Sequence, residues 1–263
     1  FGAHPLLHAI EFWRTGMATD KAAWITVGKG NARQEAVTST SGGFAWLMVN
    51  ATLPAALAAY LRQSLRILNE ECFARREDLQ THTEILPGLQ VPDLPARPDI
   101  TLPTRLTLVC YNTPELRELA GIWRIQLQQR GCELHTDWKD RDGWYAPDTL
   151  ADADLLLGDH LATGMTGFTL AEWFIYEPAW ATALGEERWQ QEKQQLMQYS
   201  DSEARFNAHL TPFFQRLLAE GRCTPLFHYR YRINALENVQ DMVLTAGGWL
   251  DFTRAWLPPA AIL

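Results

Sequence analysis

Two side chains that could take part in chemistry stand together at the end of an apolar run. Asp159 and His160 follow Ala153–Gly158, which we predict to be a buried strand. A carboxylate and an imidazole at the carboxyl end of a sheet strand occupy the place where open α/β folds bind ligands. A polar turn is the alternative interpretation of the same two residues.

Paired carboxylates and nucleophile motifs do not indicate a catalytic site. The pairs Glu70-Glu71 and Glu186-Glu187 are adjacent in sequence, and adjacent residues on a helix do not converge on one point. They are typical of solvated helix faces. The sequence also lacks a G-x-S-x-G elbow and a Cys–His pairing that would indicate nucleophilic catalysis. We therefore expect that the chain is not an enzyme.

Metal and nucleotide motifs are equally incomplete. His4 and His8 could share a helix face, but Pro5 lies between them and no third ligand accompanies them. Gly28–Gly30 has the first two glycines of a dinucleotide fingerprint without the third, so it indicates an ordinary glycine turn. We expect no metal site and no cofactor.

The four cysteines, Cys72, Cys110, Cys132 and Cys223, are widely separated, and none forms a C-x-x-C pair. Their spacing excludes a zinc ribbon and a thioredoxin-like motif. Cys110 and Cys132 lie in apolar strand-like runs, where a thiol behaves as a small hydrophobic group. We expect four reduced thiols in a reducing compartment; two disulfides in an exported protein are the alternative.

Composition narrows the classes of partner. The chain has 263 residues, of which 47% are hydrophobic, and its net charge is −8. An acidic balance repels nucleic-acid phosphates and anionic lipid, so direct binding to either is not expected. The length suits one large domain or two lobes. Eleven tryptophans indicate a large aromatic core, although a cleft that stacks planar or sugar rings also uses tryptophan.

The clearest structural pattern is a βαβ unit that would position Asp159 and His160. Arg105–Tyr111 is predicted to be a strand, and Thr113 and Pro114 then supply an N-cap and a first-turn proline. The predicted helix ends at Gly131, a short strand Cys132–Thr136 follows, and Ala153–Gly158 is the next strand. The crossover is expected to be right-handed.

Other predicted elements surround this unit. Phe44–Asn50 is predicted to be a strand, followed by a helix that opens at Pro54. A capping box, Ser200 to Glu203, indicates a later helix that ends at Gly221. Alternation in Phe227–Ile233 predicts a half-exposed strand.

The order of these elements resembles a known family. In the second lobe of dipeptide- and oligopeptide-type solute-binding proteins, a strand ending in Tyr-Asn-Thr precedes a helix, a glycine, a second strand and a Tyr/Trp-led segment. The matching parts of this chain are Leu106–Thr113, Gly131, Cys132–Thr136, Trp144 and Asp154. Phe44–Asn50 with the Pro54 helix, and Glu203–Ile233, resemble further parts of the same family.

A phrase near the end is more specific. Gly248–Pro258 resembles the Gly-Trp-Phe-Asp-Phe-x-x-Ala-Trp-Phe/Leu-Pro ending of SgrR-type bacterial transcriptional regulators, and Pro225–Ile233 resembles their YbaE branch. In that group an amino-terminal winged-helix DNA-binding domain precedes a solute-binding-like domain, and the proteins are cytoplasmic. The resemblance implies that this chain is a fragment that meets DNA only through an amino-terminal domain absent from it.

One departure from the family bears on the ligand. Peptide-binding members carry an Asp after the third strand of this unit that takes the peptide's amino terminus. Here Gly158 is followed by Asp159–Gly164, where that Asp has no counterpart at the matching position. A neutral or sugar-like solute is therefore favoured over a peptide held by its charged ends.

The resemblance implies an α/β fold of the type 2 periplasmic-binding-protein kind, with one complete lobe and part of the other. We expect residues 44–221 to form the second lobe and residues 1–43 and 222–263 to contribute segments of the first, with chain crossings near Phe44 and Cys223 as the hinge. The expected function is to sense a small solute in the interlobe cleft for a cytoplasmic transcriptional regulator, without a membrane partner. The alternative is a substrate-binding component of an ABC-type peptide or solute importer.

The candidate ligand-binding residues line this hinge and the strand ends. They are Trp46, Asn50, Trp144, Asp159 and His160. Each could instead serve the core or a turn.

Overall fold

The computed structural model describes most of the chain. The described residues are 10–12, 25–28, 37–38, 43–81, 84–86, 89–90, 99–161, 167–230, 232–235, 240–241, 251, 253–254 and 256. The predicted pair His4 and His8 lies outside these residues, as does most of Gly248–Pro258.

A six-stranded mixed sheet is the centre of the described structure. Its strands lie in the order β5-β11-β4-β10-β8-β9. Their bounds are β5 Leu79–Gln80, β11 Cys223–Tyr229, β4 Gly43–Val49, β10 Leu155–Leu161, β8 Arg105–Tyr111 and β9 Glu133–Lys139. β8, β9, β10 and β11 run in one direction, and β4 runs antiparallel to its neighbours β10 and β11. The four parallel strands therefore end, and β4 begins, at one edge, which we call the carboxyl edge.

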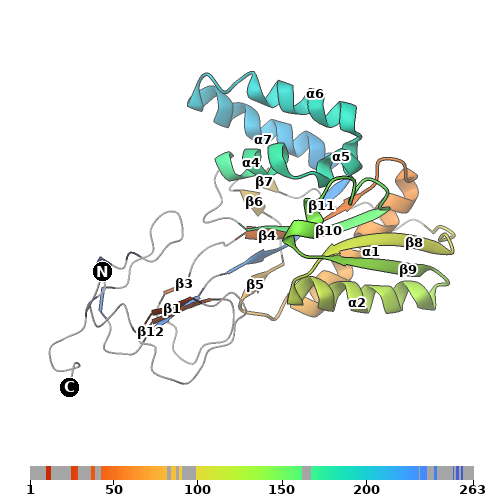
Figure 1. Ribbon diagram of the computed structural model, residues 1–263, viewed down its shortest axis with the longest axis horizontal. Helices are drawn as coiled ribbons and strands as arrows, with labels where there is room; N and C mark the ends of the chain where they lie inside the picture. The colour runs from red at the N-terminus through yellow and green to blue at the C-terminus, as the bar shows by residue number, and fades with distance from the viewer. Residues whose placement is uncertain are drawn as a thin grey trace.

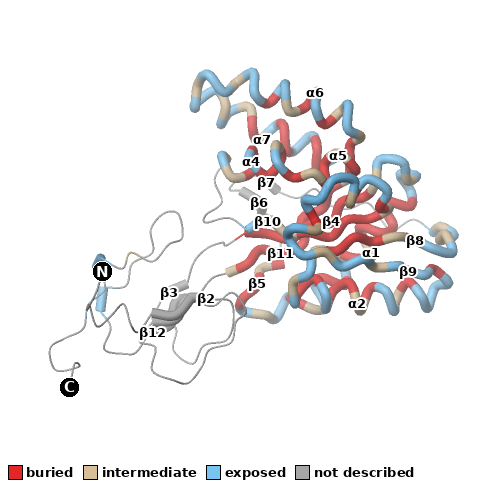
Figure 2. The backbone as a smooth tube through the Cα atoms, in the orientation of Figure 1, coloured by how far each residue is buried: buried red, intermediate tan, exposed pale blue. Residues whose placement is uncertain are grey.

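Helices cover both faces of this sheet (Figure 1). One face packs against α1 (Ala55–Phe73) and α2 (Pro114–Gln129). The other packs against α4 (Gly167–Tyr176), α5 (Ala179–Leu184), α6 (Glu186–Met197) and α7 (Glu203–Ala219). Figure 2 shows the buried residues concentrated in the sheet and on the inner sides of these helices. The result is a three-layer arrangement, which confirms the predicted α/β fold class.

The continuous apolar run of β4 follows from its central position. Successive side chains of a strand point to opposite faces, so Phe44, Trp46 and Met48 enter the core under α4–α7. The side chains between them, such as Leu47, enter the core under α1 and α2. Because every residue of β4 is buried, the strand shows no polar alternation.

The predicted βαβ unit is confirmed at its helix start and its turn, and its strands are present with other bounds. β9 ends at Lys139 and β10 at Leu161, so Asp159 and His160 lie within β10 and do not follow it. The Thr113 side chain caps α2 by accepting from the Leu116 backbone N–H, and Pro114 is the first helical residue. Gly131 has φ of +80°, the left-handed conformation that a glycine adopts after a helix. β8 pairs in parallel with both β9 and β10. The helix between β8 and β9 therefore forms a parallel crossover.

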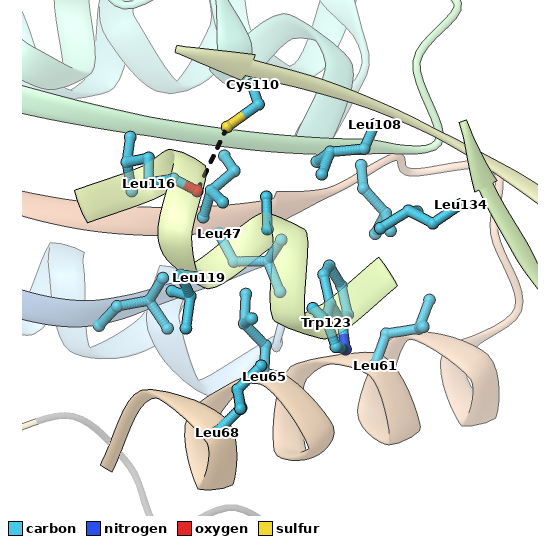
Figure 3. Close-up of a cluster of buried hydrophobic side chains, with 14 of the residues drawn as sticks. Leu47, Leu61, Leu65, Leu68, Leu108, Cys110, Leu116, Leu119, Trp123 and Leu134 are labelled. Carbon is cyan, nitrogen blue, oxygen red and sulfur yellow. Dashed lines mark hydrogen bonds between the residues drawn. The ribbon is translucent and has the colours of Figure 1, made fainter. Parts of the chain in front are cut away.

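A leucine-rich cluster joins this unit to α1 (Figure 3). Leu61, Leu65 and Leu68 of α1 meet Leu119 and Trp123 of α2, and the Trp123 indole N–H donates to Ser64 Oγ at 3.0 Å. The spacing along each helix is three or four residues, which places the leucines on one stripe. Burial of this stripe holds both helices on the sheet.

Two sequence predictions at the end of the described region are wrong. The cap of α7 is Ser202, whose hydroxyl accepts from the Arg205 N–H, so the helix does not begin with a capping box at Ser200. The strand predicted over Phe227–Ile233 is divided: β11 ends at Tyr229 and is buried on both faces, whereas β12 (Arg232–Ala235) belongs to another sheet. His228 therefore lies inside, because α7 covers the face that alternation had left open to solvent.

A second sheet is formed by short strands from both ends of the chain. Its order is β1-β2-β12-β3, with β1 Ile10–Phe12, β2 Ile25–Gly28 and β3 Val37–Thr38. The chain leaves this sheet after β3 to enter β4, and returns to it from β11 to β12. The second crossing thus follows Tyr229 and not Cys223, because β11 runs antiparallel to β4 and must traverse the six-stranded sheet first. The lobe boundary at residue 221 stays a prediction.

Three further details complete the described part. A hairpin is formed by β6 (Glu84–Leu86) and β7 (Leu89–Gln90). Among the helices that the structure describes, none has the length and apolar character needed to cross a membrane. The four cysteines are free thiols.

Candidate functional site

A close aromatic contact lies at the middle of β10, on the face covered by α4–α7. Gly158 lies against Trp46 and Trp144, and a Cβ added at this glycine would lie 2.6 Å from the Trp46 ring and 3.1 Å from the Trp144 ring. The two indole rings meet edge to face, with centroids 5.8 Å apart. Both tryptophans are buried, so the structure brings these two predicted site residues together beside the strand that also carries Asp159 and His160.

A short helix positions Trp144. α3 (Arg141–Trp144) begins immediately after β9, where the Asp140 side chain caps it by accepting from the Gly143 N–H at 2.8 Å. Trp144 is the last residue of this turn and also contacts Tyr111, the last residue of β8. Tyr145 follows at the carboxyl edge and is 54% exposed. The cap thus turns the chain so that one aromatic ring enters the core and the next faces solvent.

Glu177, which the sequence analysis did not single out, is the buried acid behind these rings. It lies between α4 and α5 and is 3% exposed. Its Oε1 accepts from Trp144 Nε1 at 2.9 Å and from the Ala179 N–H at 3.1 Å, and its Oε2 accepts from the Tyr145 hydroxyl at 3.5 Å. Burial raises the pKa of Glu177 from 4.5 to about 7, although these three donors oppose the shift.

Tyr145 stays a neutral phenol. Partial burial, together with the negative charge of Glu177, raises the pKa of Tyr145 to about 12. The hydroxyl is therefore a donor or an acceptor of hydrogen bonds at any physiological pH.

Asp159 and His160 do not converge on one point. Neighbouring residues of a strand point to opposite faces, and Asp159 lies on the α1 and α2 face, where its Oδ2 accepts from the Tyr229 hydroxyl at 2.8 Å. Burial, with the nearby charges of Asp159 and Glu115, raises the pKa of Tyr229 well above its ordinary value. Asp159 therefore acts on this face as the acceptor for a buried tyrosine.

His160 faces the other layer. Its ring meets Phe44 edge to face, with centroids 6.0 Å apart, and burial lowers the pKa of His160 to about 4 although a hydrogen bond with the Thr169 backbone opposes the shift. The imidazole is thus neutral at physiological pH. It shares the face of Trp46 but lies nearer the carboxyl edge.

Asn50 lies at the opposite edge of the sheet. It follows β4, about 23 Å along the strand from Gly43. Its Nδ2 donates to the Ala153 carbonyl at 2.9 Å, and its Oδ1 accepts from the Thr52 N–H and hydroxyl, which makes a turn cap. The structure therefore separates Asn50 from the other four predicted residues. Ligand binding by any of the five stays a prediction.

Exposed aromatic and aliphatic side chains gather around the carboxyl edge. Leu161 ends β10, Trp138 lies near the end of β9, and Tyr145 follows α3; α4, which begins after β10, exposes Phe168 and Tyr176. We call these five residues the rim. A contiguous patch of exposed apolar side chains is typical of a surface that binds a ligand or another protein.

Several charged groups of the region are engaged within the protein, whereas Arg141 and Asp142 of α3 are exposed. The carboxylates of Glu177 and Asp159 accept the hydrogen bonds described above, and Lys139 pairs with Asp137. In the described part of the chain, His, Cys, Asp and Glu side chains form no group of three or more that could hold a metal ion. Besides the exposed charges of α3, this edge therefore offers ring faces and the Tyr145 hydroxyl.

Sequence comparison finds relatives of two kinds, while no protein-family model matches the chain. YbaE, an uncharacterized protein of Escherichia coli K12, is 32% identical in an alignment 276 residues long that covers 97% of this chain and 48% of YbaE. The HTH-type transcriptional regulator SgrR of Pectobacterium atrosepticum is 25% identical in an alignment 161 residues long that covers 59% of this chain and 27% of the regulator. The chain therefore spans about half the length of YbaE, and less of SgrR.

Solved structures show the fold. NikA of Brucella suis, in complex with Fe(III)-EDTA, aligns with a TM-score of 0.63 at 12% identity and covers 84% of this chain and 52% of NikA. The oligopeptide-binding protein AppA of Bacillus subtilis, in complex with a nonapeptide, aligns with a TM-score of 0.57 at 12% identity and covers 91% of this chain and 53% of AppA. The fold is thus that of the type 2 periplasmic solute-binding proteins. The chain is thus similar in sequence to YbaE and to the regulator SgrR, and similar in fold to the solved solute-binding proteins.

Proposed function

We propose that the chain binds a small solute at the carboxyl edge of the six-stranded sheet and does not alter it chemically. The observation that carries this proposal is the rim, together with the two chain crossings. Both crossings, from β3 to β4 and from β11 to β12, reach the six-stranded sheet at this edge. A solute held there would lie beside the start of β4, which pairs with the end of β10, so its binding would bias the relative position of the two sheets.

A neutral or sugar-like solute suits the chemistry of this edge. The exposed rings of Tyr145 and Phe168 can stack on planar or sugar faces, and the Tyr145 hydroxyl can hydrogen-bond. The Trp138 ring already carries the Arg117 guanidinium, 5.5 Å from its centroid, and so offers less of its surface. Asp159 already accepts from Tyr229, which leaves it poorly placed to fix a peptide's amino terminus. The neighbouring folds accept ligands as different as a nonapeptide and a metal chelate, so the side chains and not the fold select the ligand.

The biological role that we propose is sensing within a transcriptional regulator in the cytoplasm. The similarity to SgrR supports it, and DNA would be bound by a separate domain. Solute binding changes the output only if the affinity differs between open and closed forms. We also propose that the second lobe extends from residue 43 to residue 229, because β11 pairs with β4 in the same sheet.

A role as the substrate-binding component of an importer is the second candidate. The solved neighbours that bind peptides and chelates favour it. The two roles differ in what the intact gene encodes before this region. A winged-helix domain there supports the sensor, and a secretion signal supports the importer.

A thermal-shift screen tests solute binding in either role. The panel contains neutral monosaccharides, sugar phosphates, dipeptides and the nickel–histidine complex. A solute present at about 100 times its Kd stabilises the folded state by about 2.7 kcal/mol, which raises the Tm by several degrees. Mass spectrometry of the recovered solute should show it unchanged. A recovered product, or a panel without any shift, contradicts the proposal.

A further inference from the structure

The hydrogen bond between Glu177 and Tyr145 connects a buried carboxyl to the exposed rim. Glu177 is enclosed between α4 and α5, whereas the Tyr145 ring lies at the carboxyl edge with about half its surface exposed. Among the described residues, the hydrogen bond to Glu177 Oε2 comes from the Tyr145 hydroxyl at 3.5 Å, while Oε1 accepts from both the Trp144 indole and the Ala179 backbone N–H. Protonation of Oε2 therefore changes the hydrogen bond of Tyr145 at the rim, while the hydrogen bond from Trp144 to Oε1 is retained.

We propose that Glu177 is a positioning residue whose protonation state decides which hydrogen bond the Tyr145 hydroxyl offers to a solute at the rim. This inference rests on the proposed function, because it concerns the same edge. An ionised Glu177 accepts the Tyr145 proton in a hydrogen bond, which leaves the phenolic oxygen to act outward as an acceptor only. A protonated Glu177 carries its proton on Oε2 and donates it to Tyr145, whose own O–H then points outward as a donor.

The surroundings of Glu177 favour a change near neutral pH. Burial raises its pKa to about 7, Asp159 on β10 adds to the shift, and the groups that stabilise the carboxylate are neutral N–H and O–H donors. Cys223 on β11 also faces Glu177, but burial raises the pKa of that thiol so that it stays neutral. Tyr111 on β8 and Arg141 on α3 act on Tyr145, which stays protonated throughout.

The consequence is a choice between two classes of solute. The ionised form suits a solute that donates a hydrogen bond to Tyr145, such as a hydroxyl or an amine. The protonated form suits a solute that accepts one, such as a carbonyl or a phosphate oxygen. The same rim would therefore favour acceptor solutes at mildly acidic pH and donor solutes at mildly alkaline pH.

Resonance Raman spectra of tyrosine test this inference without any solute. The intensity ratio of the tyrosine doublet distinguishes a phenol that donates from one that accepts, and the spectrum of wild type minus Tyr145→Phe isolates Tyr145. Between about pH 5.5 and about pH 8.5 the protonated-to-ionised ratio of Glu177 passes from roughly 30:1 to roughly 1:30. We expect the Tyr145 signal to change from acceptor to donor over this range. The contribution of the exposed Tyr176, isolated with Tyr176→Phe, should not change.

Glu177→Gln is the matched variant. The glutamine amide can donate to Tyr145 and accept from Trp144, so it imitates the protonated acid and should hold Tyr145 as an acceptor at both pH values. A Tyr145 signal that is constant in the wild type, or that changes equally in Glu177→Gln, overturns the inference.

Wild-type protein labelled with ¹³C at the glutamate carboxyls gives a second measurement in case the variant fails to fold. One resonance should titrate near pH 7, and its titration should respond to Tyr145→Phe. A protein in which every glutamate titrates below about pH 6 overturns the inference. Because neither measurement uses a solute, their failure leaves the proposed solute binding standing, and a failed solute screen leaves this result standing.

Discussion

The stability of the protein should depend on pH through Glu177. Burial raises the pKa of this carboxyl from 4.5 to about 7 in the folded state, while the unfolded chain returns it to its ordinary value. Between these pH values the native protein holds a proton that the unfolded chain has lost. The free energy of unfolding therefore falls as the pH rises through this window, by about 3 kcal/mol in total, and the loss is complete above about pH 7.

Urea unfolding of the wild type and of Glu177→Gln isolates this effect, because the other titrating groups cancel in the difference. The wild type should lose about 3 kcal/mol relative to the variant between about pH 4.5 and about pH 7. Glu172→Gln, on the exposed side of α4, is the matched control and should give a flat difference. A flat difference for Glu177→Gln, or one that rises with pH, refutes the reasoning that burial without a cation destabilises this carboxylate.

Three further substitutions test the packing and the ion pairs. Gly158→Ala pushes a methyl group into two indole rings and should cost about 1–3 kcal/mol in urea unfolding. Leu65→Ala removes a fully buried leucine and should cost about 2–5 kcal/mol, whereas Ile67→Ala, two residues away and 46% exposed, should change the stability by about 0.5 kcal/mol or less. The hydrogen-bonded guanidinium of Arg216 lowers the pKa of Glu192 in the folded state. The ion pair therefore stabilises the folded state above the pKa that Glu192 has in the unfolded chain, and this stabilisation is lost as the pH falls through its folded-state pKa. Glu192→Gln should remove this acid-side loss, which is about 1 kcal/mol or less because Arg216 is half exposed.

Local signals in the sequence were sufficient for the βαβ unit. Thr113, Pro114 and Gly131 each act through their own backbone, so their types alone fix where α2 begins and ends. The same approach misplaced the cap of α7, because Ser200 and Ser202 both precede the helix and only the backbone geometry selects Ser202. The alternation in Phe227–Ile233 also predicted an exposed face, because a sequence pattern does not show that α7 covers this face of β11.

The site was less accessible from the sequence. Asp159 and His160 look like a pair in the chain, but the two-residue period of a strand sends them to opposite faces. Glu172 and Glu177 lie five residues apart in one apolar stretch. The sequence pattern does not indicate that Glu177 is buried and Glu172 is exposed. Asn50 comes directly after the last residue of β4, at the edge of the sheet opposite the carboxyl edge. Contacts of this kind depend on residues that are distant in sequence, such as Trp144 and Glu177.

Calorimetric titration at the rim tests the central proposal most directly. A solute from the panel should bind the chain, and Tyr145→Ala should weaken that binding at least about tenfold, or about 1.4 kcal/mol. Ile125→Ala, on the exposed surface of α2, is the control and should leave the Kd unchanged. Binding that is equally strong in Tyr145→Ala, or a panel in which no solute binds, contradicts a solute site at the carboxyl edge.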